Sequence, residues 1–317
     1  MREHRCSADA LHRTWDNSLT PSLTVDSGDR IVFTTVDAQD GGVPPPPWAV
    51  RRPPSSERGV QPTIRRGHPL CGPIAVREAR PGDVLAVRVL EVAPHEWGWT
   101  GTGNNGLLGM GGETSTLLYW DLRGAAAIPW TPEGIVRPPF RVPMRPFCGV
   151  MGTAPAESGE HLTTPPRRVG GNLDARRLTA GSTLFLPVAV PGALFSVGDV
   201  HAAQGDGEVC GTGIECGATV ALQLDLIRDR SVPSPAYLAP STPAAGPCYA
   251  VTGIGPDLME AAREAVRVMI GYLQAEYGLD YGHAYILCSV AVDLTITEVV
   301  NGPNWVVSAL LPLECLA

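Results

Sequence analysis

One stretch of the chain gathers side chains that could bind a metal ion or move a proton. Residues 195–215 read FSVGDVHAAQGDGEVCGTGIE and hold, among five glycines, the polar residues Asp199, His201, Gln204, Asp206, Glu208 and Glu215. In an extended strand, Asp199 and His201 project from the same face because side chains alternate. Imidazole and carboxylate are common zinc ligands, so this pair predicts a divalent-metal site, with zinc as the metal indicated by ligand type. The competing interpretation is a surface hairpin whose polar residues face water.

The turn that follows this pair supplies a candidate base. The residues QGDGE at 204–208 would turn the chain and return Glu208 to the metal pair. We expect Glu208 to act as general base on a water molecule, with Asp206 or Glu215 as alternatives. By strand alternation Glu208 and Glu215 have opposite parity, which predicts that one of them faces solvent or a subunit contact.

The same turn could also bind substrate. Gly205 and Gly207 would let backbone N–H groups approach a developing oxyanion, and we group Gln204 with them as substrate-binding. A catalytic zinc has about three protein ligands, so another segment must complete the site. Our first candidate is His68 in RRGHPLCGPI, and the further candidates are Asp26, Asp37 and Asp174.

The cysteines offer a different chemistry. None of the eight forms a C-x-x-C pair, which favours reduced thiols in a cytoplasmic protein. Cys210, Cys216 or Cys288 could be a nucleophile, but no motif surrounds them, and buried packing cysteines are the simpler interpretation.

Composition excludes several classes of function. The formal net charge of −8 argues against a nucleic-acid partner. No run of 18 apolar residues is present, and the N-terminus lacks the apolar segment of a secretory signal, so we expect no membrane segment. All 24 basic residues are arginine. Without lysine, the chain cannot build a P-loop, a Schiff base or a pyridoxal phosphate attachment site.

The elements that must position these residues are mainly strands. With 36 glycines and 31 prolines among 317 residues, the chain favours turns over long helices. Short apolar runs predict strands up to about residue 250, interrupted by loops at 40–67, 97–116 and 228–249. A helical period runs from Asp257 to near Gly278, and a short helix at about 280–290 precedes a strand in VDLTITEVV. The chain is therefore predicted to be mainly β, with a small α/β element at about 251–317.

Several segments together resemble the acetamidase/formamidase family. The stretch GALFSVGDVHAAQGDGEVCGTGIE is similar to the family's signature. Further segments resemble the family in the same order, namely WDNSLTPSLTVDSGDRIVFTTVDA, GHPLCGPIAVREARPGDVLAVRV, GVMGTAPA, TTPPRRVGGNLDARRLTAGSTLFLPVAVPGALFS and AYILCSVAVDLTITEVVNG. The resemblance covers about residues 12–312 and carries Asp199, His201 and Glu208 over as signature positions.

The resemblance implies one domain over 1–317, with a β-sandwich-like core and the α/β element, in a homo-oligomer. It also implies hydrolysis of a small amide, of the formamide or acetamide type, to a carboxylate and ammonia, with zinc or another metal ion. Some similar proteins act on lactams. Two other amidase classes use Ser-Ser-Lys or Glu-Lys-Cys arrangements, and neither can be built from a chain without lysine.

Two departures from the family bear on the choice of substrate. Trp305 and Val307 stand where similar proteins often carry smaller or polar residues, and the loop VPPPPWAVRRPPSSERG is unusual in length and composition. Three hypotheses follow. The first is a metal-dependent amide hydrolase, the second is a cysteine-nucleophile amide or lactam hydrolase, and the third is a non-catalytic member that keeps the fold.

Overall fold

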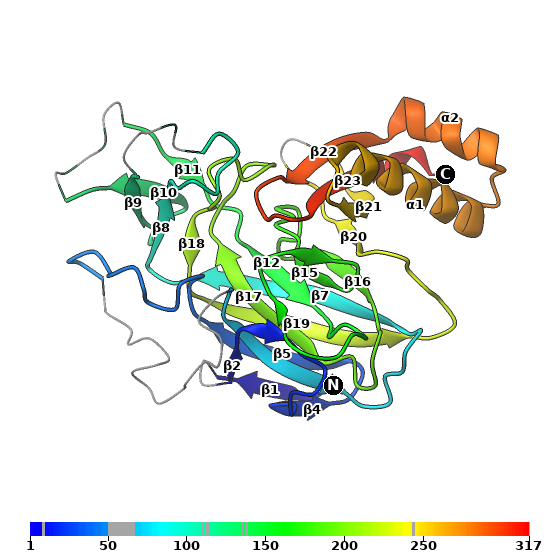
Figure 1. Ribbon diagram of the computed structural model, residues 1–317, viewed down its shortest axis with the longest axis horizontal. Helices are drawn as coiled ribbons and strands as arrows, with labels where there is room; N and C mark the ends of the chain where they lie inside the picture. The colour runs from blue at the N-terminus through cyan, green and yellow to red at the C-terminus, as the bar shows by residue number, and fades with distance from the viewer. Residues whose placement is uncertain are drawn as a thin grey trace.

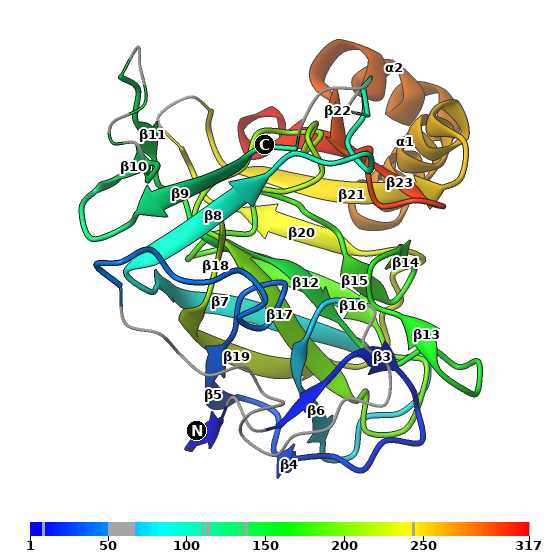
Figure 2. The same ribbon diagram turned by 60° about the vertical axis from the view of Figure 1, so that its left-hand side comes forward.

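A computed structural model describes residues 1–7, 10–49, 67–109, 111, 115–132, 134, 136, 139–242 and 245–316. Strands are the predominant regular structure in these residues, and two large sheets organise them (Figures 1 and 2). Part of the loop predicted at 40–67, namely residues 50–66, lies outside the described residues.

The first sheet joins segments from both ends of the chain. In the described residues its strands lie in the order β1 (Glu3–Cys6), β5 (Asp29–Thr35), β19 (Ala218–Ile227), β7 (Val84–Pro94), β16 (Thr183–Pro187), β20 (Ala236–Ala239), β21 (Cys248–Gly255), β23 (Trp305–Pro312) and β22 (Asp293–Glu298). The strands of the predicted C-terminal α/β element thus continue this sheet.

The second sheet carries Asp199, His201 and Glu215. Its main path in the described residues is β11 (Val142–Pro143), β10 (Ala126–Trp130), β9 (Leu117–Asp121), β8 (Trp97–Gly101), β18 (Glu215–Cys216), β17 (Phe195–His201), β12 (Phe147–Gly152), β15 (Gly170–Asn172) and β14 (Pro166–Arg167). A branch adds β6 (Leu70–Val76), which pairs with β17, β2 (Leu11–His12) and β4 (Leu23–Val25). Separately, β3 (Thr14–Trp15) pairs with β13 (His161–Leu162).

The two sheets pack face to face around an apolar core. Phe33 of β5 and Phe195 of β17 are fully buried and meet edge to face, with ring centroids 6.4 Å apart. Leu85 and Leu222 of the first sheet belong to the same buried cluster as Val197 of the second. The mainly β, sandwich-like fold predicted from the sequence is confirmed.

Two helices in the described residues cover the C-terminal strands. Helix α1 (Leu258–Tyr277) begins at its N-cap Asp257 and ends at Gly278, which is left-handed with φ 66°. Its buried face packs on β21 and β23, where a Cβ on Gly253 would lie only 1.9 Å from the carbonyl oxygen of Ala261. Helix α2 (Tyr281–Ala291) follows, and a 3₁₀ turn (Leu313–Cys315) ends the described chain. Neither helix combines the length and apolar character needed to cross a bilayer.

Two predicted loops are partly wrong. The glycine-rich segment at 97–116 begins with strand β8, whose residue Trp99 is buried. The proline-rich segment at 228–249 contains β20, which is buried along most of its length. In both segments, pairing with neighbouring strands overrides a composition that favours turns.

Candidate active site

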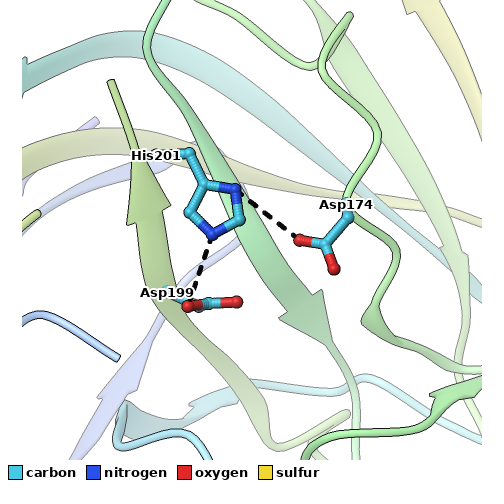
Figure 3. Close-up of side chains that lie close together, drawn as sticks. All are labelled: Asp174, Asp199 and His201. Carbon is cyan, nitrogen blue, oxygen red and sulfur yellow. Dashed lines mark ion pairs between the residues drawn. The ribbon is translucent and has the colours of Figure 1, made fainter. Parts of the chain in front are cut away.

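Buried acidic and imidazole side chains converge at the end of β17. Figure 3 shows the imidazole of His201 between the carboxylates of Asp174 and Asp199. The Nδ1 atom of His201 lies 3.8 Å from Oδ1 of Asp174, and its Nε2 atom lies 3.5 Å from Oδ1 of Asp199. All three side chains are 1% exposed. Asp174 comes from the segment after β15, so the second sheet brings distant parts of the chain together.

Three further side chains complete this group. Oε2 of Glu215 lies 3.1 Å from Nε2 of His201, and Oε1 of Glu208 lies 3.9 Å from Nδ1. Nδ1 of His68 lies 2.7 Å from Oδ2 of Asp199, and the His68 side chain is 20% exposed. We call Asp174, Asp199, His201, Glu208, Glu215 and His68 the His201 centre.

The backbone at this centre is strained. Asp174, Asp199 and Glu208 have φ of 44°, 54° and 48°, in the left-handed region that residues with a Cβ seldom adopt. Gly149 lies opposite Asp199 in the ladder between β12 and β17. A Cβ on Gly149 would lie 2.4 Å from Oδ1 of Asp174 and 2.9 Å from Oδ2 of Asp199. A glycine is therefore needed for the two carboxylates to approach each other.

Electrostatics at the centre follow from burial opposed by close charges. Burial raises the pKa of Glu215 to about 7, and burial together with the nearby Asp174 raises the pKa of Glu208 well above its ordinary value. Burial alone would lower the pKa of His201, but Glu215 and Asp199 outweigh it and raise that pKa. Burial would likewise raise the pKa of Asp199, but the imidazoles of His68 and His201 hold it below its usual range.

Gln204 fixes which nitrogen of His201 is free. The amide Nε2 of Gln204 donates to the carbonyl oxygen of Asp174 over 2.9 Å, and a carbonyl can only accept. The Oε1 atom of Gln204 therefore faces Nδ1 of His201, 2.7 Å away, and accepts its proton. In the neutral imidazole this leaves the lone pair on Nε2, toward Asp199 and Glu215.

A C-terminal segment closes the other side of Asp174. Nδ2 of Asn301 donates to Oδ2 of Asp174 over 2.5 Å, and Oε2 of Glu298 accepts from the backbone N–H of Asn301 over 2.9 Å. Burial, followed by the charge of Asp174, raises the pKa of Glu298 to about 8. The backbone N–H of Gly207 donates to the carbonyl of Thr297 over 3.0 Å, which holds the turn after β17 against this segment.

Many of the converging atoms make no aligned hydrogen bond. Among the described residues these buried atoms include Nδ1 of His68, Oδ1 of Asp174, both carboxylate oxygens of Asp199, Nε2 of His201 and Oε2 of Glu215. Buried polar atoms without partners are costly, and at a functional site they commonly mark the place of an ion or ligand. Two sets of side chains have ligating atoms within 4.8 Å of one another, namely Asp174, Asp199 and His201, and His201, Glu208 and Glu215. The centre is thus a possible metal-binding group made of nitrogen and oxygen donors.

The structure places the predicted residues as follows. Asp199 and His201 lie on one side of β17, and His68 lies beside Asp199. The prediction that either Glu208 or Glu215 faces solvent is wrong, because both are buried, at 6% and 2% exposure. Strand parity failed here because the chain between them leaves the strand and turns back, so the alternation does not continue.

The remaining candidates lie away from the centre or at its edge. Asp206 pairs with Arg176 over 2.9 Å, and Asp26 pairs with Arg77 over 2.8 Å. Of the three further ligand candidates, Asp174 is the one that joins the His201 centre. The carboxylate of Asp37 instead accepts the indole N–H of Trp99 over 3.3 Å.

Sequence reasoning missed Glu298, Asn301 and Gly149. Glu298 ends an alternating strand and is fully buried, and a carboxylate at a buried strand end was the available signal. Asn301 and Gly149 gave no signal in spacing, because their roles depend on strands that pair across the fold.

A cavity of about 760 Å³ adjoins the centre at Glu215. It is lined by residues 35–37, 40–45, 94–97, 99, 122–123 and 215–217. The first residues of the unusual loop, Val43, Pro44 and Pro45, line it. Val307, by contrast, packs under the C-terminal helices.

Comparisons with known proteins agree with this picture. The model of the Acetamidase/Formamidase family matches residues 2–161 and 156–317. A formamidase of Methylophilus methylotrophus is 26% identical over 373 residues, covering 96% of this chain and 89% of that protein. An acetamidase of Mycolicibacterium smegmatis is 30% identical over 221 residues, covering 51% and 54%.

Solved structures extend the likeness to three dimensions. The crystal structure of an acetamidase from Bacillus halodurans has a TM-score of 0.84 and 28% identity, covering 98% of each chain. Because the family model spans nearly all residues and the fold agrees along its length, this chain belongs to the Acetamidase/Formamidase family.

Proposed function

We propose that this chain hydrolyses the C–N bond of a small amide to a carboxylate and ammonia, using a water molecule activated at the His201 centre. The observation that carries the proposal is the convergence of buried, unpartnered carboxylate and imidazole atoms in a chain of this family. Relatives named formamidase and acetamidase support the reaction class.

The donors of the centre fit a divalent cation, and zinc is our choice by ligand type. Nε2 of His201, the carboxylates of Asp199 and Glu215, and His68 would hold it. When bound, such an ion would lower the pKa of a coordinated water molecule and polarise the amide carbonyl. Gln204 would act here by keeping Nε2 of His201 free of its proton.

We propose that Glu208 moves the protons of the reaction. Its carboxylate oxygen, Nε2 or Nδ1 of His201 and an oxygen of Glu215 lie within 4.8 Å of one another, a span that one hydrogen-bonded water can bridge. Glu208 would take a proton from the attacking water and return it to the departing nitrogen, which leaves as ammonia. Glu215 is the alternative base. Asp206 is less suited, because its carboxylate is paired with Arg176.

The glycine turn is less open than the sequence suggested. The N–H of Gly207 is donated to Thr297, so it is already engaged. A Cβ on Gly205 would meet no atom within 4 Å, so that position has room for a bound molecule. Contact of Gly205 and Gln204 with substrate stays a prediction.

Thiol chemistry has less support. Burial raises the pKa of the Cys216 thiol. The half-buried thiol of Cys210 donates to the carbonyl oxygen of Thr212 over 3.4 Å. Cys288 lies on the buried face of helix α2, in the apolar cluster that the helices form with the C-terminal strands. Burial also raises its pKa. Neither Cys216 nor Cys288 is therefore set up as a thiolate at neutral pH.

The test measures ammonia released from formamide, acetamide, propionamide and a γ-lactam, before and after chelation and after thiol alkylation. We expect release that chelation abolishes, that added zinc restores and that alkylation leaves in place. Loss on alkylation alone would favour a cysteine nucleophile. No release from any of these amides at high protein concentration would favour a non-catalytic member.

Two further predictions remain proposals. We propose that the chain assembles as a homo-oligomer, and exposed apolar residues on α2, with Ile286 62% and Val290 75% exposed, would suit such a contact. Light scattering of the purified protein measures this directly. The cytoplasmic location also stays a prediction.

A further inference from the structure

The cavity beside Glu215 is far larger than acetamide requires. At about 760 Å³ it lies in the range of roughly 300–1,000 Å³ in which proteins enclose drug-sized ligands. Formamide and acetamide have only a few heavy atoms each. We propose that this cavity binds an uncharged, ring-bearing side chain on the acyl group of the substrate, so that arylalkyl amides are favoured. This inference rests on the proposed function, because it assigns the substrate class of the same centre.

Strand pairing connects the cavity to the reacting centre. His201 of β17 pairs with Glu215 of β18, and Glu215 pairs in turn with Trp99 of β8. Directly paired residues project from the same face of a sheet, with Cβ atoms about 5 Å apart. Glu215 therefore lies between His201 and Trp99 in the sheet, and its carboxylate reaches Nε2 of His201. Because Glu215 and Trp99 both line the cavity, a substrate whose carbonyl reaches the centre has space beyond it there.

The walls of the cavity favour a flat, apolar group. Trp97 and Trp99 provide indole surfaces, and Val43, Pro44 and Leu122 add aliphatic surface. An aromatic ring packs well against such a wall, by burial of area and by edge or offset ring contacts.

Three charged groups that line the cavity, Asp37, Asp40 and Arg123, are already engaged. The carboxylate of Asp37 accepts two backbone N–H groups and the indole N–H of Trp99. Asp40 is paired with Arg13 over 3.2 Å. Arg123 lies over the ring of Trp48 and is paired with Asp121. A charged substrate group would find no ready partner among these side chains, whereas a neutral ring needs none.

The chain offers a matched pair of tryptophans for the test. Trp97 and Trp130 both pack on Tyr119, with ring centroids 6.2 and 5.8 Å from it, but of the two only Trp97 lines this cavity. The measured quantity is the ratio of kcat/KM for phenylacetamide to that for acetamide. We expect the ratio to exceed one in the wild-type protein. It should fall about tenfold or more in Trp97→Ala and stay within about twofold in Trp130→Ala.

A second variant keeps the test valid if Trp97→Ala does not fold. Glu96 is exposed and lines the cavity, so Glu96→Trp should fill its mouth and lower the same ratio. Glu91→Trp, at an exposed position that does not line the cavity, is its control. Equal ratios in the cavity variants and in their controls would overturn the inference.

The outcomes separate this inference from the proposed function. If the protein hydrolyses acetamide but phenylacetamide is neither hydrolysed nor a competitive inhibitor, the inference fails and the proposed function stands. If no amide is hydrolysed, the proposed function fails. Calorimetric titration with phenylacetamide then tests whether the cavity binds a ring-bearing amide. Binding that is lost in Trp97→Ala and kept in Trp130→Ala would then support the cavity, and absence of binding would overturn it.

Discussion

Half-buried His12 and buried His201 contact side chains of the same strand, β17, and their surroundings are opposite. His12 lies against Ser196, with Nε2 2.7 Å from the Ser196 hydroxyl and Nδ1 2.8 Å from the carbonyl oxygen of Thr14. Both ring nitrogens are thus hydrogen-bonded, and burial lowers the pKa of His12 to about 4. His201, at the other end of β17, is surrounded by carboxylates that raise its pKa, and its Nε2 makes no aligned hydrogen bond.

Residue types alone therefore do not identify a reacting site. A serine beside a histidine looks like a nucleophile and its base, yet Ser196 is fully buried and the pair forms a closed, neutral contact. The His201 centre contains charged groups and buried polar atoms without hydrogen-bond partners, whereas both ring nitrogens of His12 are hydrogen-bonded. Unsatisfied atoms and like charges held together are the features that distinguish the two regions.

Replacing each histidine by asparagine tests whether His201 acts in catalysis and His12 in stability. We expect His201→Asn to lower kcat/KM for acetamide by about 10³-fold or more, because a ligand and its charge are lost. His12→Asn should lower the free energy of unfolding by about 1–3 kcal/mol, through lost hydrogen bonds, with little change in kcat. Steady-state kinetics and denaturant unfolding measure both. Equal loss of activity in the two variants would show that His201 and His12 do not differ in this way.

Replacing the base tests the proton-transfer role. We expect Glu208→Gln to lower kcat by about 10²–10⁴-fold while bound metal, measured by elemental analysis, is kept. Asp206→Asn is the matched control in the same turn and should keep activity within a few-fold, since Asp206 pairs with Arg176. Near-normal turnover in Glu208→Gln would assign the base to Glu215 instead.

A single methyl group tests the geometry of the centre. Gly149→Ala places a Cβ against Asp174 and Asp199, and we expect about a 10²-fold loss of kcat/KM from displaced carboxylates. Gly205→Ala meets no atom within 4 Å and should change activity only slightly. Circular dichroism confirms that both variants fold. A large loss in Gly205→Ala with a raised KM would support the predicted contact of Gly205 with substrate.

The two regions should also give opposite pH dependences of stability. Glu215 has a raised pKa of about 7, so above its unfolded pKa the metal-free folded protein binds a proton that the unfolded chain has lost. Stability from this group therefore falls as pH rises from about 4.5 to 7, and the raised pKa of His201 acts in the same direction. His12, whose pKa is lowered to about 4, destabilises the fold as pH falls from about 6.5 to 4.

Thermal unfolding of metal-free protein between pH 5 and 8 measures this contrast. We expect Tm to change little between pH 5 and 6, where His12 and Glu215 act in opposite directions, and to fall as pH rises above about 6.5. Added zinc should reverse this fall because the ion takes the place of the protons. In His12→Asn, the opposing effect of His12 is lost, so Tm should fall with rising pH from pH 5 onward. A Tm of the metal-free protein that rises with pH above about 6.5 would contradict the charge balance proposed for the His201 centre.

The sequence predicted much of the fold because local signals agreed with it. Asp257 and Gly278 cap the two ends of α1, as their residue types predicted. Alternating apolar runs predicted strands such as β5 and β19. β8 and β20 were missed, because glycine and proline near them suggested turns while neighbouring strands hold them in place.

The candidate site was predictable where its residues are close in sequence. Asp199 and His201 followed from strand spacing. The positions of Glu298 and Asn301 could not be predicted from spacing. β22 lies at the edge of the first sheet, and only folding brings the end of β22 to the turn after β17. Strand parity wrongly predicted that either Glu208 or Glu215 faces solvent or a subunit contact, because the turn after β17 interrupts the alternation of side chains between them.

The left-handed backbone of Asp174, Asp199 and Glu208 has a consequence for selection on this protein. Glycine adopts such φ values without steric cost, so replacing any of the three by glycine should relieve strain of about 1 kcal/mol or more. Selection for thermal stability alone would therefore favour the loss of these carboxylates. Their retention in an evolving population requires continued selection for activity, so a library screened for both properties should keep all three acidic residues, whereas one screened only for heat resistance should lose them first.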